Sequence, residues 1–290
     1  MTRTAPAKIN LALDILGARQ DGYHEMRMVM QTVSLCNTVV LQEAAEGFSL
    51  HTDGDFIPGG RVTLEQQAAE AFFRELGSPC PPMSVTLKRQ IPAYAGLGGG
   101  SADVAALLRL LRQQYAPALP TETLEKIGLA VGCDMPFCVR GGTALAEGRG
   151  EILTDLPPLP PCWIVLCKPC LDIPTAEMFA RVHGAEICRR PDIDGMVEAL
   201  RAGSLRGVAE RLCNVFEEVL PPEMGREIRR IKGELRRRGA LNAAMSGSGP
   251  AVFGLFREEG PASAACAGLK VQYAQTYLAR PVERLDGPAV

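Results

Sequence analysis

A glycine-rich segment, Gly96-Leu-Gly-Gly-Gly-Ser101, has residue types that suit the binding of a phosphate group. Its three consecutive glycines present no side chain, so backbone N–H groups can approach a ligand closely. An apolar run with helical spacing follows, and the first turn of a helix offers unpaired N–H groups and a dipole that favours an anion. Ser101 is placed either to cap that helix or to turn its hydroxyl toward a phosphate or a metal ion. The segment therefore predicts a phosphate-binding loop.

Two widespread phosphate-binding patterns do not fit this loop. A Walker A loop needs Lys-Ser or Lys-Thr directly after its glycines, and here Ser-Ala-Asp follows. The glycine spacing and the position of the next acidic residues also disagree with the Rossmann fingerprint. At this point an ordinary glycine-rich connection between a strand and a helix remains the alternative.

Asp134 and Lys8 are the side chains whose chemistry best complements a bound phosphate. Asp134 stands before Met-Pro, where it is either a turn aspartate or a carboxylate that accepts a hydroxyl proton during phosphoryl transfer. Lys8 shares one face of a predicted strand with Asn10. Beside Asp134, the Lys8 ammonium would keep the carboxylate ionised and polarise a substrate hydroxyl. Sequence spacing does not show that these two side chains meet, because only the fold can bring them together.

Tyr23 and His24 follow Asp21-Gly22 in a predicted turn. An aromatic ring next to an imidazole could stack on a nucleobase and form hydrogen bonds with it. A solvated turn is the simpler interpretation, and the residue types alone favour it.

Hydrophobic periodicity predicts the strands and helices that must position these side chains. Period-two patterns predict strands over residues 7–13, 28–35, 38–43, 48–51, 83–88, 162–167 and 251–256, with a hairpin over 143–153. Helical spacing predicts helices over residues 64–76, 104–111, 121–132, 175–182, 195–201, 205–219 and 224–238. Four prolines in residues 156–161 cannot continue a helix or a central strand, so they predict a boundary between domains at 1–156 and 162–290.

Composition limits the class of protein. The 290 residues are 47% hydrophobic and 22% charged, which is ordinary for a globular protein with a large core. The net charge of −2 gives no overall attraction to nucleic acid or to acidic membranes. The chain has no apolar stretch of membrane-spanning length and no apolar signal core near its first residue. These features predict a cytoplasmic protein without a membrane partner.

Cysteines and a basic run each suggest a further site that other features argue against. Ten cysteines lie mostly in apolar segments, which indicates reduced, buried thiols. Cys162, Cys167 and Cys170 have a spacing found in some iron–sulfur proteins, but strand alternation explains the first two and no fourth ligand stands out. The seven basic residues between Arg226 and Arg238 alternate with glutamates, so they predict a solvated helix face rather than a nucleic-acid site.

Five segments in this order resemble the GHMP kinase superfamily. They are Pro6-Ala-Lys-Ile-Asn-Leu11, Asp21-Gly-Tyr-His24, Gly96–Ser101, Gly132-Cys-Asp-Met-Pro136 and Ser246-Gly-Ser-Gly-Pro250. The first two segments together are similar to a branch that phosphorylates the 2-hydroxyl of a diphosphocytidyl-linked methylerythritol on the non-mevalonate isoprenoid route. The resemblance implies an α+β fold with an N-terminal domain like ribosomal protein S5 domain 2 and a C-terminal ferredoxin-like domain.

The same resemblance implies a role for each candidate residue. Asp134 would be the catalytic base, assisted by Lys8, with Mg²⁺ and ATP as cofactors and Ser101 as the candidate magnesium ligand. The acceptor would be held by Asn10, Tyr23, His24, Thr175 and Phe179. ATP would lie along Pro92, Ala93, Tyr94, Ala95, Gly96, Leu97, Gly98, Gly99, Gly100, Ser101 and Ala102. Residues 246–249 would close over the site, and the protein is expected to be a monomer or a weak homodimer.

Two positions depart from the family pattern, and two other functions compete. Tyr94 is bulky where small residues are usual, so its ring either packs near the nucleotide base or turns outward. Thr63 begins a predicted helix where the family often has asparagine; threonine still caps a helix, but a contact with adenine there is in doubt. The competing functions are a kinase for another small alcohol, such as mevalonate or homoserine, and a ligand-binding regulator without catalysis. Tyr23-His24 argues against the first, and the presence of both Lys8 and Asp134 argues against the second.

Overall fold

The computed structural model describes residues 1–52, 55–56 and 62–285, which form an α+β fold with two sheets. Within these residues the larger sheet has eight strands: β1 (Thr2–Ala18), β2 (His24–Glu43), β3 (Phe48–Thr52), β4 (Asp55–Phe56), β5 (Met83–Lys88), β6 (Thr143–Gly148), β7 (Ile152–Asp155) and β9 (Cys213–Asn214). Six of them run in the order β4-β3-β5-β2-β1-β9, while β6 pairs with β2 and β7 pairs with β6.

In the described part of the chain the smaller sheet has four strands in the order β10-β11-β8-β12. Their bounds are β8 (Trp163–Cys167), β10 (Asn242–Met245), β11 (Val252–Phe256) and β12 (Thr276–Ala279). The helices are α1 (Leu64–Glu75), α2 (Gly99–Tyr115), α3 (Thr121–Leu129), α4 (Met135–Arg140), α5 (Thr175–Val182), α6 (Ile193–Arg201), α7 (Leu205–Glu210), α8 (Pro222–Arg237) and α9 (Glu259–Lys270), with a 3₁₀ turn at Val215–Glu218. None of these described helices is both long and apolar enough to cross a membrane.

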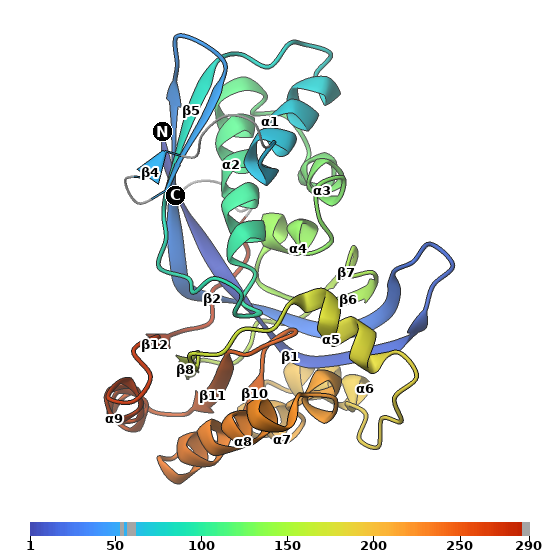
Figure 1. Cartoon of the computed structure of the whole chain (residues 1–290), viewed down its shortest axis with the longest axis vertical. Helices are drawn as coiled ribbons and strands as arrows, with labels where there is room; N and C mark the ends of the chain where they lie inside the picture. Colours follow the sequence, from blue (N-terminus) through green and yellow to red (C-terminus); the bar gives the residue numbers. More distant parts are fainter. Residues whose placement is uncertain (53–54, 57–61, 286–290) are drawn as a thin grey trace.

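The two sheets lie in different parts of the molecule, and the predicted α+β class is confirmed. Figure 1 shows α1 to α4 beside one face of the larger sheet in the upper part, while α8 and α9 flank the smaller sheet below. The long β1–β2 ribbon crosses between the two parts and ends in a hairpin at the right. Side chains of β1 and β2 can therefore contact both the upper helices and the lower part of the molecule.

The larger sheet is organised around β2, which is one continuous strand. Residues 38–43 of β2 pair with β5, and residues 26–31 pair with β6. The sequence predicted two strands, 28–35 and 38–43, where the structure has the single strand β2, and the residues between them include Asn37. Asn37 is buried; its oxygen accepts hydrogen bonds from the backbone N–H groups of Gln90 and Ile91, both at 2.8 Å, and its nitrogen donates to Asp103. These partners let a polar residue lie inside a continuous strand.

Helix α2 follows the glycine loop and is buried from Ala102 to Leu111. Its Arg109 is 1% exposed and donates hydrogen bonds to the carbonyl oxygens of Cys138 (2.6 Å) and Val139 (3.1 Å) at the end of α4. A cation at the C-terminal end of a helix satisfies carbonyl groups that have no partner within the helix. Arg109 thereby fixes the short helix that begins immediately after Asp134.

The predicted helix over 205–219 was wrong in its second half. Helix α7 ends at Glu210, and β9 then pairs in parallel with β1, with Leu13 opposite Asn214. The Asn214 side chain donates hydrogen bonds to the carbonyl oxygens of Met245 and Gly247, which a continuous helix would not allow at this position. Long-range polar contacts therefore override the helical spacing of the apolar residues.

The basic run over residues 226–238 has a structural explanation. Arg230, Arg237 and Arg238 at α8 form ion pairs with glutamates of the same helix, as expected for a solvated face.

Cys162 and Cys167 are buried, and burial raises the pKa of each thiol to about 12. Both therefore stay protonated at neutral pH, which is unfavourable for binding a metal as thiolate.

Asp103 gives the fold a testable dependence on pH. It lies on α2 with no exposed surface, and burial raises the pKa of its carboxyl from 3.8 to about 6 despite hydrogen bonds from Asn37 and Arg89. The folded protein thus holds this proton more tightly than the unfolded chain. The free energy of unfolding therefore decreases as the pH rises from about 4 to about 6, and the loss is complete above that range.

We expect Asp103→Asn to remove this contribution, because an amide keeps the Asn37 contact without a buried charge. Relative to the wild type, the variant should gain about 1 kcal/mol of unfolding free energy between pH 5 and pH 7.5. Urea unfolding at both pH values measures this gain, with Asp172→Asn as the exposed-carboxylate control. Equal pH dependence in the wild type and Asp103→Asn would contradict the buried-charge assignment.

Candidate functional site

The glycine loop connects β5 to α2 and has the backbone geometry of an anion site. Helix α2 begins at Gly99, and its N-cap Gly98 has the left-handed φ of 69° that glycine adopts at little cost. A Cβ atom on Gly100 would meet no described atom within 4 Å, so this part of the loop faces open space. The predicted capping role of Ser101 is wrong, because Ser101 lies inside the first helical turn. Its half-buried hydroxyl remains a candidate for a phosphate or a metal ion.

Two of the loop glycines are required by protein contacts as well as by a ligand. A Cβ atom on Gly98 would lie 2.9 Å from Cγ of Lys8, and one on Gly96 would lie 2.1 Å from the carbonyl oxygen of Ser246. The backbone of the loop is tied to both parts of the molecule, because Lys8 N–H donates to the Leu97 carbonyl and Ala251 N–H donates to the Ala95 carbonyl. The loop is therefore a junction between the two sheets.

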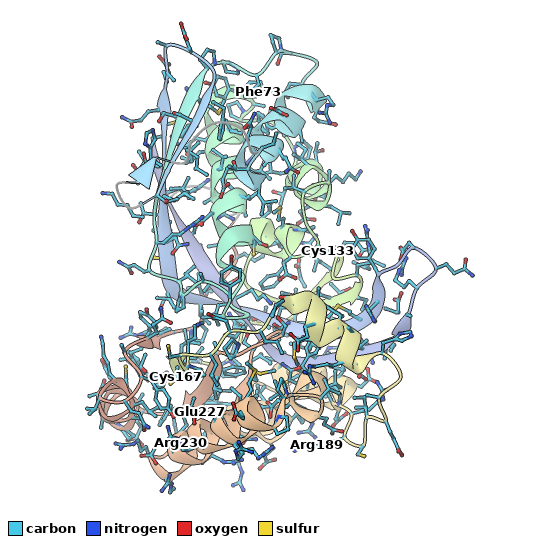
Figure 2. All side chains as sticks on the ribbon, in the orientation of Figure 1. Phe73, Cys133, Cys167, Arg189, Glu227 and Arg230 are labelled. Carbon is cyan, nitrogen blue, oxygen red and sulfur yellow. The ribbon has the colours of Figure 1, made fainter. Side chains whose placement is uncertain are left out.

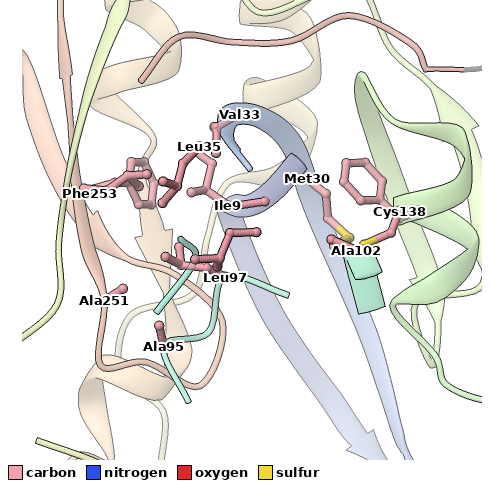
Figure 3. Packing of buried hydrophobic residues seen from close by; sticks show 14 of the residues in the cluster. Ile9, Met30, Val33, Leu35, Ala95, Leu97, Ala102, Cys138, Ala251 and Phe253 are labelled. Carbon is pink, nitrogen blue, oxygen red and sulfur yellow. The ribbon is translucent and has the colours of Figure 1, made fainter. Parts of the chain in front are cut away.

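The apolar side of this junction is continuous. Figure 3 shows Leu97 beneath Ile9 and places Ala95 beside Ala251, with Phe253 of β11 nearby. All five of these side chains are at most 2% exposed. Tyr94, by contrast, is 79% exposed with a positive φ of 51°, so its ring turns outward. The buried packing of Ala95 and Leu97 therefore does not involve the Tyr94 ring.

Lys8 and Asp134, which lie far apart in the sequence, meet beside this loop. Nζ of Lys8 lies 3.3 Å from Oδ2 of Asp134 and donates a hydrogen bond to Oδ1 of Asn10 at 2.9 Å. The Lys8 side chain is 6% exposed, whereas that of Asp134 is 33% exposed. A buried cation thus stands behind a carboxylate that solvent and a substrate can reach. This is the arrangement needed to accept a proton next to a phosphate.

Asp134 owes its position to α4. It stands at the N-cap of this helix, yet its side chain makes no capping hydrogen bond to the described residues. Its oxygens therefore stay available to Lys8 and to a ligand. Figure 2 places the neighbouring Cys133 where the upper helices approach α5, so the carboxylate lies near the boundary between the two parts of the molecule.

His24 and Phe179 form the other end of the site. The His24 imidazole, at the start of β2, stacks on the Phe179 ring of α5 with centroids 4.8 Å apart, and Phe216 contacts Phe179 edge-on at 5.1 Å. Nε2 of His24 is buried and has no hydrogen-bond partner among the described residues. Burial, and secondarily the charge of His183, lowers the pKa of His24, so the ring is neutral at neutral pH. An unpaired buried nitrogen next to an aromatic wall suits a planar polar ligand.

The remaining predicted acceptor residues are distributed around these two groups. Tyr23 is 49% exposed, and the Arg149 guanidinium lies 4.7 Å from its ring centroid. Thr175 forms a 2.9 Å hydrogen bond with Ser248, which links α5 to the loop over 246–249. The amide of buried Asn10 is held by Lys8 on one side and by a 3.2 Å contact with the Met28 sulfur on the other. The structure therefore places Asn10 beside the Lys8–Asp134 pair and His24 at the aromatic end.

The loop over 246–249 reaches the glycine loop from the smaller sheet. The Ser246 hydroxyl donates to the Gly96 carbonyl at 3.0 Å and accepts a hydrogen bond from the N–H of Asn10 at 3.3 Å. Phe216, Arg149 and Asn214 also contribute to this region, and sequence reasoning missed all three. The helix predicted over 205–219 includes Cys213 and Asn214, so it hid the pairing of these two residues with β1.

Metal binding at this site would depend on a bound nucleotide. Among residues 1–52, 55–56 and 62–285, no three histidine, cysteine or acidic side chains lie close enough together to hold a metal ion. Mg²⁺ commonly uses one or two protein oxygens and completes its shell with phosphate oxygens and water. Asp134 and Ser101 fit that limited contribution.

Thr63 caps α1, since its hydroxyl oxygen accepts a hydrogen bond from the N–H of Gln66 at 3.2 Å. The threonine thus performs the capping role predicted from its type.

Known proteins share this arrangement along most of the chain. The family model described as "GHMP kinases N terminal domain" matches residues 63–142, and "GHMP kinases C terminal" matches residues 196–275. Proteins named 4-diphosphocytidyl-2-C-methyl-D-erythritol kinase from Bacillus cereus (strain AH187) and Bacillus anthracis (strain CDC 684 / NRRL 3495) are each 39% identical over 277 residues, covering 95% of both chains.

Solved structures agree with the sequence comparisons. A crystal structure of 4-(cytidine 5'-diphospho)-2C-methyl-D-erythritol kinase has 32% identity and a TM-score of 0.80, covering 97% of this chain and 99% of that one. A homoserine kinase from Cytophaga hutchinsonii shares the fold, with a TM-score of 0.75 at 17% identity over 100% of this chain and 96% of its own. With both family models matched and a glycine loop that meets a Lys–Asp pair, the chain belongs to the GHMP kinase family.

Proposed function

We propose that this chain transfers the γ-phosphoryl group of ATP to the 2-hydroxyl of 4-diphosphocytidyl-2-C-methyl-D-erythritol. The family supports ATP as the phosphoryl donor, and the names of the 39%-identical relatives support this acceptor. The single observation that carries the acceptor is the buried, unpaired Nε2 of His24 against the Phe179 ring. A cytosine ring is planar and has polar edges that could satisfy this nitrogen. Mevalonate and homoserine have no aromatic group that could pack against the His24 and Phe179 rings.

The chemistry proceeds by direct transfer. Asp134 accepts the proton of the substrate hydroxyl while the hydroxyl oxygen bonds to the γ-phosphorus of ATP. The bond between the γ-phosphorus and the β,γ-bridging oxygen then breaks, and ADP is released. The Lys8 ammonium, 3.3 Å from Asp134, stabilises the negative charge that develops on the transferring group. Backbone N–H groups at the start of α2 face the remaining phosphate oxygens.

The proposal also covers the magnesium ion, the rest of the acceptor site and the state of the protein in the cell. Mg²⁺ would be held mainly by the ATP phosphates, with Ser101 or Asp134 contributing an oxygen, and would neutralise phosphate charge. Tyr23, Asn10 and Thr175 would complete the acceptor site. We further propose that the protein acts in the cytoplasm as a monomer or weak homodimer without a nucleic-acid partner.

The experiment that tests this function is ADP release from Mg²⁺-ATP with 4-diphosphocytidyl-2-C-methyl-D-erythritol, mevalonate or homoserine as acceptor. We expect turnover with the cytidyl acceptor alone. Turnover with another alcohol would keep the kinase assignment and overturn the acceptor. Folded protein that binds ATP but phosphorylates none of them would instead favour the regulator alternative.

Asp134→Asn should retain ATP binding and lose about 10²–10⁴-fold in kcat, because an amide cannot accept the hydroxyl proton. Steady-state kinetics and nucleotide titration measure the two effects. Asp155→Asn is the control, since Asp155 forms ion pairs with Arg140 and Arg284 away from the glycine loop. Near-normal turnover by Asp134→Asn would remove Asp134 from the role of base.

His24→Phe should raise the KM for the cytidyl acceptor about tenfold, which is the size of one good hydrogen bond. Phenylalanine keeps the stacking on Phe179 but removes the ring nitrogens, so kcat and the KM for ATP should change little. His183→Phe, at an exposed neighbouring histidine, is the control. An unaltered acceptor KM would contradict the nucleobase contact.

A further inference from the structure

Asn214 is a buried polar residue whose contacts extend to both ends of the site. It ends β9, the short strand by which the C-terminal half of the chain joins the larger sheet, and it is 3% exposed. Its Nδ2 donates to the carbonyl oxygens of Met245 (2.9 Å) and Gly247 (2.8 Å), and its Oδ1 accepts from Phe216 N–H at 3.0 Å. Both donors and the acceptor of the amide are thus occupied.

The two donated hydrogen bonds fix the loop that touches the donor end of the site. Gly247 belongs to this loop, and a Cβ atom there would lie 2.9 Å from the Gly96 carbonyl oxygen and 3.4 Å from Nζ of Lys8. Ser246 forms the hydrogen bonds to Gly96 and Asn10 described above. Gly247 and Gly249 both have positive φ and little intrinsic stiffness, so the loop depends on outside contacts for its position.

The accepted hydrogen bond fixes the acceptor end. Phe216 is fully buried, and its ring meets Phe179 edge-on, with an interplanar angle of 87°. Phe179 in turn stacks on His24. The hydrogen bond between Thr175 and Ser248 connects the same helix to the same loop. One amide therefore lies between the loop at the phosphate end and the aromatic wall at the nucleobase end.

We propose that Asn214 is a positioning residue that holds the donor and acceptor ends of the site in register. It contacts neither substrate itself. Its two donors set the loop against the glycine loop and Lys8, and its acceptor sets the Phe216–Phe179 wall against His24. The inference rests on the proposed function, because it assigns the two ends to ATP and to the cytidyl acceptor.

Asn214→Ala tests the proposal, with Asn242→Ala as the matched control. Asn242 is also an asparagine of the C-terminal part, and its Nδ2 donates to the Ala209 carbonyl at 2.8 Å without a contact to either loop. Asn214→Ala removes a buried amide and Asn242→Ala a half-buried one, so both should lower the melting temperature. Only Asn214→Ala should raise both the KM for ATP and that for the cytidyl acceptor, each about tenfold.

Asn214→Asp separates the two ends. A carboxylate keeps an oxygen for Phe216 N–H, but it places a second oxygen against the Met245 and Gly247 carbonyls where the amide donated. We expect the acceptor KM to stay within about twofold of the wild type while the KM for ATP rises about tenfold. This split distinguishes positioning from a general loss of stability.

The outcomes are distinct. Equal KM changes in Asn214→Ala and Asn242→Ala, unchanged KM values in Asn214→Ala, or loss of folding in both Asn214 variants would overturn the positioning role. Wild-type protein that does not phosphorylate the cytidyl acceptor in the same assay would overturn the proposed function instead. Wild-type turnover with the predicted split in Asn214→Asp supports both.

Discussion

The ion pair between Lys8 and Asp134 is the constraint around which the rest of the structure is arranged. A lysine side chain that is 6% exposed needs an anionic partner, because an unpaired buried cation is costly. That partner comes from a different element, so β1 and the start of α4 must be held together. Gly98 leaves room for the lysine stem, and Arg109 fixes the far end of α4. The loop, the strand and the helix thus share one electrostatic requirement.

The site also depends on how the two sheets are joined. Strand β9 extends the larger sheet with residues from the C-terminal half, and the loop over 246–249 is tied to the glycine loop. On the outer side, Arg27 forms an ion pair with Asp194, and Arg190 pairs with Asp14. These contacts link the β1–β2 ribbon to the C-terminal helices. The Arg27–Asp194 pair is largely exposed and contributes little, whereas Asp14 of the second pair is buried and depends on Arg190 for its partner.

Much of the site was accessible from sequence, whereas the residues that support it were not. Residue types and local patterns marked the glycine loop, Asp134, Lys8 and His24 as candidates, and the family resemblance supplied their expected roles. Asn37, Arg109 and Asn214 have no such pattern, because each has a hydrogen-bond partner far away in the sequence, at 66, 29 and 33 residues respectively. Period-based reasoning counts a polar residue as an interruption or as a solvent-facing position. It therefore divided β2 and extended α7, at the places where buried amides are satisfied by distant backbone groups.

The unbroken course of β2 has a consequence for how this protein can change length during evolution. His24, at one end of the strand, stacks on Phe179, and Asn37 of the same strand fixes Gln90 and Ile91, which lead into the glycine loop. The β1–β2 pairing shifts register once between Thr32 and Cys36, and inserting or deleting one residue elsewhere would turn the side chains up to that shift to the opposite face of the sheet. The strand therefore fixes the spacing between His24 and Asn37, and with it the spacing between the aromatic wall and the segment that leads into the glycine loop. Length can vary more easily at the hairpin tip over 19–22 than between these two residues.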